Sequence, residues 1–280
     1  METRLDTATH ALASQGLAPS AARMLAGDVL ELEFPDGDAA AILTILGDHF
    51  DPADVLVAER AIVVPDLFVS DMDSTMIGQE CIDELADFAG LKHEVAAITE
   101  RAMQGELDFE SALRERVLLL RDLSEEAIAQ CLATRIEPMP GARVLVETLK
   151  ARGCRTVLVT GGFHHFADPI AEQLGFERVV GNRLAIDGGR ITGELVGPIT
   201  DSSVKRVTLE AELAELGEGA VALATGDGAN DVPMLIAADY GIAYRAKRAA
   251  RLAANGWIDR GDLTSVLRLL GIPHAEWVGD

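Results

Sequence analysis

The sequence predicts an α/β fold: a Rossmann-like parallel sheet with helices on both faces, an inserted helical cap and a small N-terminal α+β domain. From about residue 65 onward, short and fully apolar runs alternate with longer stretches of helical periodicity. Such runs are typical of parallel strands that helices cover on both faces. Hydrophobic residues make up 49% of the chain and aromatic residues only 4%, which indicates the mostly aliphatic core common in α/β proteins.

Residues 1–66 are predicted to form the small α+β domain, because they mix helical and alternating patterns without a recognisable catalytic motif. The expected elements are a helical segment from Ala8 to Leu25, a strand from Val29 to Phe34, a buried helix from Ala39 to Leu46 and a short strand from Val55 to Val57. The role of this domain stays open. It could sense a ligand or partner, mediate dimerisation, or serve only as a packing element.

Four apolar runs are predicted to form the strands of a catalytic core made of residues 67–79 and 141–280. They are Leu67 to Ser70, Thr156 to Thr160, Ala220 to Thr225, and Gly241 to Tyr244. Each of the first three is followed by acidic or glycine residues. Because ligands of open parallel sheets bind at the carboxyl ends of the strands, we expect these three strand ends to build one site.

Two insertions are predicted to lie over this core. Residues 80–140 carry helical periodicity and would form a cap above the strand ends. Residues 181–198 contain two short alternating runs around Asp187-Gly188-Gly189, which predict a β-hairpin flap.

The pair Asp71 and Asp73 follows the first predicted strand directly. Two carboxylates at a strand end repel each other unless a cation neutralises them. Oxygen ligands without a nearby His or Cys suit Mg²⁺. A turn with two solvated acids would fit the pair equally well.

Three further motifs follow along the chain, and each has an ordinary structural alternative. Thr160-Gly161-Gly162 offers backbone N–H groups to an anion, although it also reads as a tight turn. Lys205 lies in the first turn of a predicted helix, where the helix dipole disfavours a cation and an anionic partner would explain it. The stretch Gly226-Asp227-Gly228-Ala229-Asn230-Asp231 offers hard-cation ligands but lacks the spacing and terminal Glu of a calcium loop.

The order of these motifs resembles the haloacid dehalogenase superfamily of aspartate-nucleophile phosphatases, over about residues 65–270. Within it, several segments resemble the phosphoserine phosphatases: Asp71 to Glu80, Met103 to Val117, Gly161 to Phe163, Asn182 to Leu184, and Gly226 to Asp231. One departure is Thr160, since that family usually has Ser at this position.

The resemblance implies hydrolysis of O-phospho-L-serine, the last step of serine biosynthesis, through an aspartyl phosphate on Asp71. Asp73 would be the general acid and base. Mg²⁺ would be held by the Asp71 carboxylate, the Asp73 backbone carbonyl and Asp227, with a water ordered by Asp231. The substrate phosphate would be bound by Thr160, Gly161, Lys205 and Asn230.

The resemblance also implies how the rest of the substrate is recognised. Glu80 would meet the substrate ammonium, Arg116 would grip its carboxylate, and Phe109 would cover it. Without the resemblance, a salt bridge between Arg116 and Glu115 or Glu110 would be the simpler interpretation, and Phe109 would be core.

Charge and composition exclude several other partners. A formal net charge of −22 disfavours nucleic acid and acidic membrane surfaces. The three widely spaced cysteines support neither a disulfide framework nor a zinc site, and they fit the cytoplasm. The expected partner is a small-molecule substrate, and a homodimer is compatible with the sequence. Rival hypotheses are another small-molecule phosphatase, a phosphotransferase, and a regulatory sensor.

Overall fold

The computed structural model describes residues 2–25, 29–35, 37–104 and 106–279. Outside the described residues lie 1, 26–28, 36, 105 and 280. They fall within the predicted domains and include Gly105 of the segment Met103 to Val117. The helices are α1 Glu2–Ser14, α2 Ala39–Phe50, α3 Cys81–Phe88, α4 Lys92–Met103, α5 Phe109–Leu119, α6 Glu125–Arg135, α7 Ala142–Ala151, α8 His164–Leu174, α9 Ser202–Leu216, α10 Val232–Ala237, α11 Arg248–Ala253 and α12 Thr264–Leu269. Two short 3₁₀ turns cover Ala229–Asp231 and His274–Glu276.

The strands are β1 Ala21–Met24, β2 Leu30–Glu33, β3 Asp54–Leu56, β4 Leu67–Ser70, β5 Arg155–Phe163, β6 Arg178–Asn182, β7 Leu184–Asp187, β8 Arg190–Leu195, β9 Ala222–Gly226, β10 Tyr240–Tyr244 and β11 Gly256–Ile258. Seven of them form the central sheet, in the order β3-β11-β10-β9-β4-β5-β6. All neighbouring pairs in this sheet are parallel except β3 and β11. The predicted α/β class with a parallel sheet is therefore confirmed.

Strand β4 lies between β9 and β5, so the carboxyl ends of these three strands are neighbours. This arrangement confirms the expected meeting of the first three strand ends. Strand β5 runs through Gly161 and Gly162 to Phe163, with an irregular pairing to β6 after Val159. The predicted glycine turn is thus an irregular strand end that leads straight into α8.

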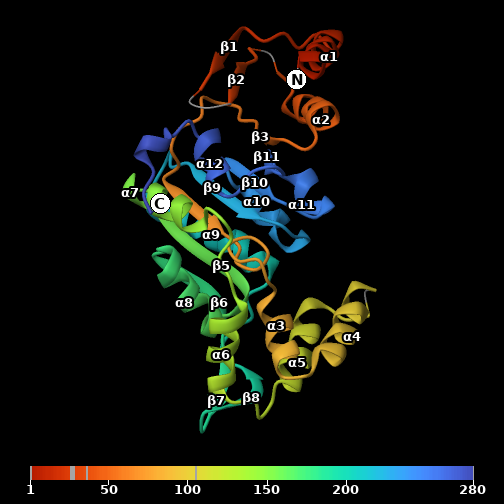
Figure 1. The fold of residues 1–280 in the computed structure, drawn as a ribbon, viewed down its shortest axis with the longest axis vertical. Helices are drawn as coiled ribbons and strands as arrows, with labels where there is room; N and C mark the ends of the chain where they lie inside the picture. The colour runs from red at the N-terminus through yellow and green to blue at the C-terminus, as the bar shows by residue number, and fades with distance from the viewer. Residues whose placement is uncertain (1, 26–28, 36, 105, 280) are drawn as a thin grey trace.

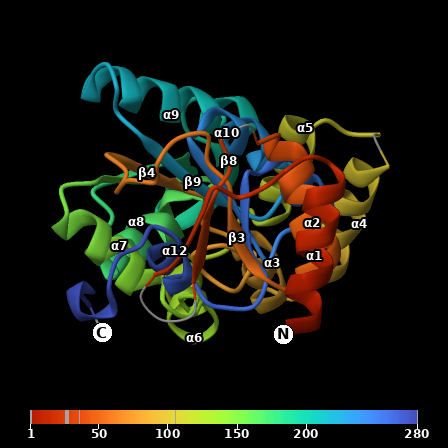
Figure 2. The ribbon, with the colours of Figure 1, turned by 90° about the horizontal axis from the view of Figure 1, so that it is seen from above.

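Side chains of the sheet alternate between two cores. Phe68 and Leu158 pack with α7, α8 and α12 on one face. Leu67, Val69 and Val157 pack on the other face, which α9, α10 and α11 cover. Figure 2 shows α9 and α10 on one side of the strands and α7, α8 and α12 on the other. Burial on both faces explains why these strands read as continuous apolar runs.

The predicted cap is built from α3, α4, α5 and α6, which pack on one another next to the sheet (Figure 1). Strands β7 and β8 form the expected antiparallel hairpin. Two backbone hydrogen bonds connect the hairpin to the loop between α5 and α6. The Asp122 N–H donates to the Ile191 carbonyl, and the Ile191 N–H donates to the Leu123 carbonyl, each at 2.9 Å. The hairpin, predicted as part of the core, therefore contacts the cap as well.

The N-terminal elements differ from the sequence prediction in two ways. The helical prediction from Ala8 to Leu25 is wrong beyond Ser14, because Gly16 adopts a left-handed backbone and Pro19 cannot continue a helix; Ala21–Met24 is strand β1. In addition, β3 pairs with β11 of the central sheet, so the sheet crosses the boundary predicted at residue 66. Figure 1 shows α1, β1, β2 and α2 as a separate group beyond β3.

Among the residues that the structure describes, no helix is both long enough and apolar enough to cross a membrane.

Candidate active site

Asp71 follows the last residue of β4 and continues the sheet pattern, because its N–H donates to the Thr225 carbonyl of β9 at 3.0 Å. This bond fixes the backbone at the point where the chain leaves the sheet. The Asp71 residue is 4% exposed, so its carboxylate faces the protein rather than bulk solvent. The alternative of two solvated acids in a turn therefore does not hold for Asp71.

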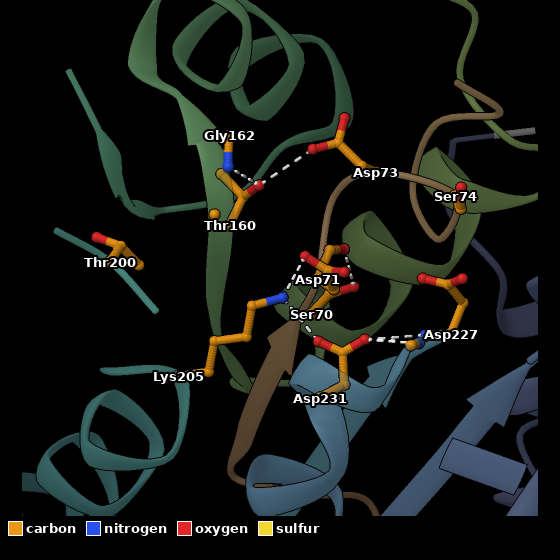
Figure 3. A network of polar contacts seen from close by, with 12 residues as sticks. Ser70, Asp71, Asp73, Ser74, Thr160, Gly162, Thr200, Lys205, Asp227 and Asp231 are labelled. Carbon is orange, nitrogen blue, oxygen red and sulfur yellow. Dashed lines mark hydrogen bonds and ion pairs between the residues drawn. The ribbon is translucent and has the colours of Figure 1, made fainter. Parts of the chain in front are cut away.

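Lys205 supplies the positive charge that this buried carboxylate needs. Its Nζ lies 2.6 Å from Asp71 Oδ1 and 2.6 Å from Asp231 Oδ1. Dashed lines in Figure 3 mark both contacts. Burial alone would lower the pKa of Lys205, but the charges of Asp71 and Asp231 outweigh it and raise this pKa. Lys205 therefore stays protonated, and the two acids explain a cation in the first turn of α9.

Asp231 closes the turn that follows β9. Its Oδ2 accepts hydrogen bonds from the N–H groups of Asp227, at 3.1 Å, and Gly228, at 3.0 Å. A Cβ at Gly226 would lie only 2.5 Å from the Asp231 Cγ, so this position requires glycine. The glycines of the motif thus let the Asp231 side chain fold back beneath the turn, while Asn230 lies on its exposed side.

Asp73 lies two residues beyond Asp71 but has different partners. One carboxylate oxygen accepts the Cys81 N–H at 2.9 Å, and the other lies 3.4 Å from the Thr160 hydroxyl. The same hydroxyl accepts the Gly162 N–H at 2.8 Å. Burial raises the pKa of the Asp73 carboxyl, although the bond from Cys81 opposes this shift. A carboxyl with a raised pKa is suited to carrying a proton.

The glycine turn also depends on Asn182, for which the sequence predicted no role. The Asn182 amide donates to the Gly161 carbonyl at 2.7 Å, and its oxygen accepts the Thr200 N–H at 2.8 Å. Asn182 thereby joins the end of β6 to the irregular end of β5 and to the segment before α9. A polar residue ending an apolar strand was the available sequence signal.

Glu80 and Arg116 are the residues predicted to recognise the substrate beyond its phosphate. Glu80 lies just before α3 and accepts a hydrogen bond from Ser74 Oγ at 3.0 Å. Burial lowers the pKa of Arg116, while the charges of Asp83 and Glu80 oppose this shift, so Arg116 lies within electrostatic reach of Glu80.

The two acids that could form a salt bridge with Arg116 pair with other arginines instead. Glu115 pairs with Arg101 at 2.8 Å, and Glu110 pairs with Arg114 at 2.7 Å. The Arg116 Nε donates to the Ala112 carbonyl of its own helix at 3.3 Å. Recognition of a substrate carboxylate by Arg116 remains a prediction.

The donor set for a cation consists of carboxylates. Asp71, Asp227 and Asp231 each offer an oxygen, and these oxygens lie within 4.8 Å of one another. Such a set fits a hard divalent cation such as Mg²⁺. It includes Asp231, which was expected only to order a water. The sequence predicted no role for Lys247, whose Nζ lies 3.2 Å from Asp227 Oδ2.

Known proteins that are similar to this chain are hydrolases, and several of them are phosphoserine phosphatases. The family described as haloacid dehalogenase-like hydrolase matches residues 68–235. The phosphoserine phosphatase of Albidiferax ferrireducens is 45% identical over 209 residues, which cover 72% of this chain and 88% of that protein. A solved phospho-aspartyl intermediate analogue of phosphoserine phosphatase has a TM-score of 0.65 and 38% identity, covering 73% of this chain and 98% of its own.

A third relative extends over the N-terminal part as well. The crystal structure of a probable phosphoserine phosphatase from Vibrio cholerae has a TM-score of 0.76 and 32% identity. The match covers 98% of this chain and 84% of that one.

Proposed function

We propose that this chain, which belongs to the haloacid dehalogenase-like hydrolase family, hydrolyses O-phospho-L-serine to L-serine and phosphate, as the last step of serine biosynthesis. The observation that carries the proposal is the buried Lys205 ammonium, 2.6 Å from both Asp71 and Asp231 at the carboxyl edge of the sheet. This cluster occurs in a chain that is 45% identical to a phosphoserine phosphatase.

Asp71 is the proposed nucleophile. One of its carboxylate oxygens forms a bond to phosphorus while the bond from phosphorus to the serine oxygen breaks, which gives an aspartyl phosphate. A water then attacks this phosphorus, and inorganic phosphate leaves with Asp71 restored. Lys205 lies beside the attacking group, where its charge stabilises the negative charge of the phosphoryl group in both steps.

Asp73 is the proposed proton carrier. It donates its proton to the serine oxygen as that oxygen leaves, and it takes a proton from the water in the second step. The Cys81 N–H holds one of its oxygens at 2.9 Å, and the raised pKa favours the protonated form needed first. Thr160 and Gly161 are proposed to bind the phosphoryl oxygens together with Asn230.

The cation site is proposed to take Mg²⁺ through the carboxylates of Asp71 and Asp227, with the Asp73 carbonyl as a further ligand and Asp231 near them. When bound, Mg²⁺ would offset the repulsion between the anionic nucleophile and the anionic phosphate. The close group of carboxylate oxygens from Asp71, Asp227 and Asp231 supports this choice of ion.

Selectivity for phosphoserine is proposed to come from Glu80 and Arg116. Glu80 would pair with the substrate ammonium, and Arg116 with its carboxylate. Phe109 would cover the bound substrate. This is supported by the position of its ring, whose Cζ lies 3.3 Å from where a Cβ at Gly161 would be.

The proposal also gives a location and an assembly. Cys81, Cys131 and Cys154 are free and buried, which suits the cytoplasm, where thiols stay reduced. A homodimer is compatible with this function, and light scattering on the purified chain would test it.

A substrate panel tests this function against its rivals. Phosphate release should be fastest from O-phospho-L-serine and slower from phosphate esters that lack its ammonium or its carboxylate. Adding acceptor alcohols should not divert the phosphate from water. A clear preference for another phosphorylated metabolite, or transfer of phosphate to an alcohol, would overturn the proposal.

The variant Arg116→Ala tests the recognition step. We expect kcat/KM for phosphoserine to fall by at least about tenfold, because a charge-assisted pair is lost. Activity on phosphoethanolamine, which has no carboxylate, should change little. Arg114→Ala is a matched control on the same helix, since Arg114 pairs with Glu110 on the surface. Equal losses of Arg116→Ala on both substrates would remove Arg116 from recognition.

A further inference from the structure

Each of the three clustered carboxylates has a lysine partner, and the two lysines differ in their freedom to move. Lys205, which pairs with Asp71 and Asp231, has a side chain only 1% exposed. Lys247, which pairs with Asp227 at 3.2 Å, has a side chain 70% exposed. Lys205 is therefore a fixed part of the site, whereas the Lys247 ammonium can swing into solvent without opening the protein.

The backbone keeps Lys247 next to the site whatever its side chain does. Its N–H donates to the Asp227 carbonyl at 2.8 Å, so the segment between β10 and α11 is tied to the turn after β9. This bond would survive substitution of the side chain. The acids around Lys247 are Asp227, which is its direct partner, and then Glu80 and Asp231, whose charges also act on it.

We infer that Lys247 is a positioning residue that neutralises Asp227 while the cation site is vacant and releases this carboxylate when a divalent cation binds. The inference rests on the proposed cation site. Its physical reason is that the Lys247 ammonium, 3.2 Å from Asp227 Oδ2, and a divalent ion bound to the same oxygen would compete and repel each other. Lys247 would thus hold the carboxylates together without the ion and weaken the affinity for it.

The size of the effect follows from the exposure of the pair. The Lys247 side chain is 70% exposed although that of Asp227 is only 9% exposed, and ion pairs open to solvent contribute about 0.2 to 1 kcal/mol. Removing the competing ammonium should therefore tighten cation binding by about 1.4-fold to fivefold. High salt should narrow the difference between the wild-type chain and the variant, because screening weakens the exposed pair.

Calorimetric titration of Mg²⁺ into the metal-stripped, full-length chain tests the inference. Lys247→Met should bind Mg²⁺ about 1.4-fold to fivefold more tightly than the wild-type chain, and Lys247→Arg should remain close to wild type. The increase in melting temperature caused by a fixed Mg²⁺ concentration should be larger for Lys247→Met, because tighter binding gives more stabilisation.

Lys92→Met is the matched control. Lys92 has a side chain 71% exposed and pairs with an aspartate, Asp87, at 3.6 Å on the cap, so this variant removes the same charge from an equally exposed lysine elsewhere. It should bind Mg²⁺ as the wild-type chain does. Equal or weaker binding by Lys247→Met would overturn the inference, as would equal tightening by Lys92→Met. Absence of Mg²⁺ binding by the wild-type chain would instead contradict the proposed cation site, and the inference with it.

Discussion

Asp71 and Asp73 are separated by one residue, yet the protein surrounds them with different groups. Asp71 is held against the Lys205 ammonium, while Asp73 is held by the Cys81 N–H and the Thr160 hydroxyl. Burial raises the pKa of both carboxyls, but the direct ion pair with Lys205 opposes this rise at Asp71 and favours its ionised form. The proposed nucleophile and proton carrier therefore differ in the way that the two steps of the reaction require.

Glu80 gives the clearest expected pH dependence. Although part of the residue is exposed, burial of its carboxyl and then the nearby charge of Asp73 raise its pKa to about 7. Only the ionised form attracts the substrate ammonium. We therefore expect KM for phosphoserine to rise as the pH falls through about 7, because Glu80 takes up a proton there.

The variant Glu80→Gln separates the titration of Glu80 from that of the substrate phosphate. The phosphate titrates in the same way with the wild-type chain and with the variant, whereas the glutamine side chain takes up no proton. KM of the variant should be high throughout and should lack the part of the pH dependence caused by Glu80. Measuring KM between about pH 6 and pH 8 for both enzymes provides the check. Parallel pH profiles would show that Glu80 does not bind the ammonium.

Residues adjacent to strand ends could be predicted from the sequence, and residues that act through distant partners could not. Asp71, Thr160 and Asp227 follow apolar runs, so their positions followed from the strand pattern. Asn182 contacts Gly161 and Thr200, and Lys247 contacts Asp227. These partners lie far along the chain, and no local pattern predicts such contacts.

At the scale of elements, the first residue of cap helix α5 contacts the glycine turn of the core. The Phe109 ring lies 3.3 Å from the position of a Cβ at Gly161, a residue without a positive φ angle. Alanine therefore fits the backbone there but crowds the ring. This contact connects the cap to the proposed phosphate-binding turn.

A double-mutant cycle tests the contact. Gly161→Ala should lower kcat/KM, because the new methyl group displaces Phe109 and with it the cap. In the Gly161→Ala background, Phe109→Ala should restore part of the activity, although alone it lowers activity. The interaction energy between neighbouring residues is typically about 0.5 to 3 kcal/mol. Simple additivity of the two losses would show that the ring does not crowd this position.

Helices and strands are predicted correctly where one hydrophobic pattern dominates. They are predicted wrongly where a helix-breaking residue interrupts the pattern. The apolar run Leu67 to Ser70 is strand β4 as predicted. The Ala-rich stretch after Ala8 ends as a helix at Ser14, because Gly16 and Pro19 interrupt it. The pairing of β3 with β11 could not be predicted, since pairing between strands distant in sequence leaves no local signal.

At the scale of the molecule, Asp54 connects the N-terminal part to the core. Its carboxylate accepts hydrogen bonds from the N–H groups of Asp259, Arg260 and Gly261, and from Ser265 Oγ at 2.7 Å. Strand β3, which begins at this residue, covers the edge of β11. The central sheet therefore includes residues that precede the boundary predicted at residue 66.

Two truncations test this connection. A chain lacking residues 1–52 keeps Asp54 and β3, whereas a chain lacking residues 1–66 loses both. We expect the longer deletion to have the lower free energy of unfolding, because it removes the hydrogen bonds to Asp54 and the pairing of β3 with β11, and a typical hydrogen bond contributes about 0.5–1.5 kcal/mol. Urea unfolding of both chains provides the comparison. Equal stability would mean that the core ends at the predicted boundary.

The most direct test of the whole account is phosphate release from O-phospho-L-serine by the purified chain, before and after removal of divalent cations. Activity should be lost with the cation and return with added Mg²⁺. Asp71→Asn should keep the fold, as circular dichroism would verify, and release no phosphate above background under either condition. Substantial phosphate release by Asp71→Asn would contradict the covalent mechanism, and a wild-type chain that leaves phosphoserine intact would contradict the proposed function.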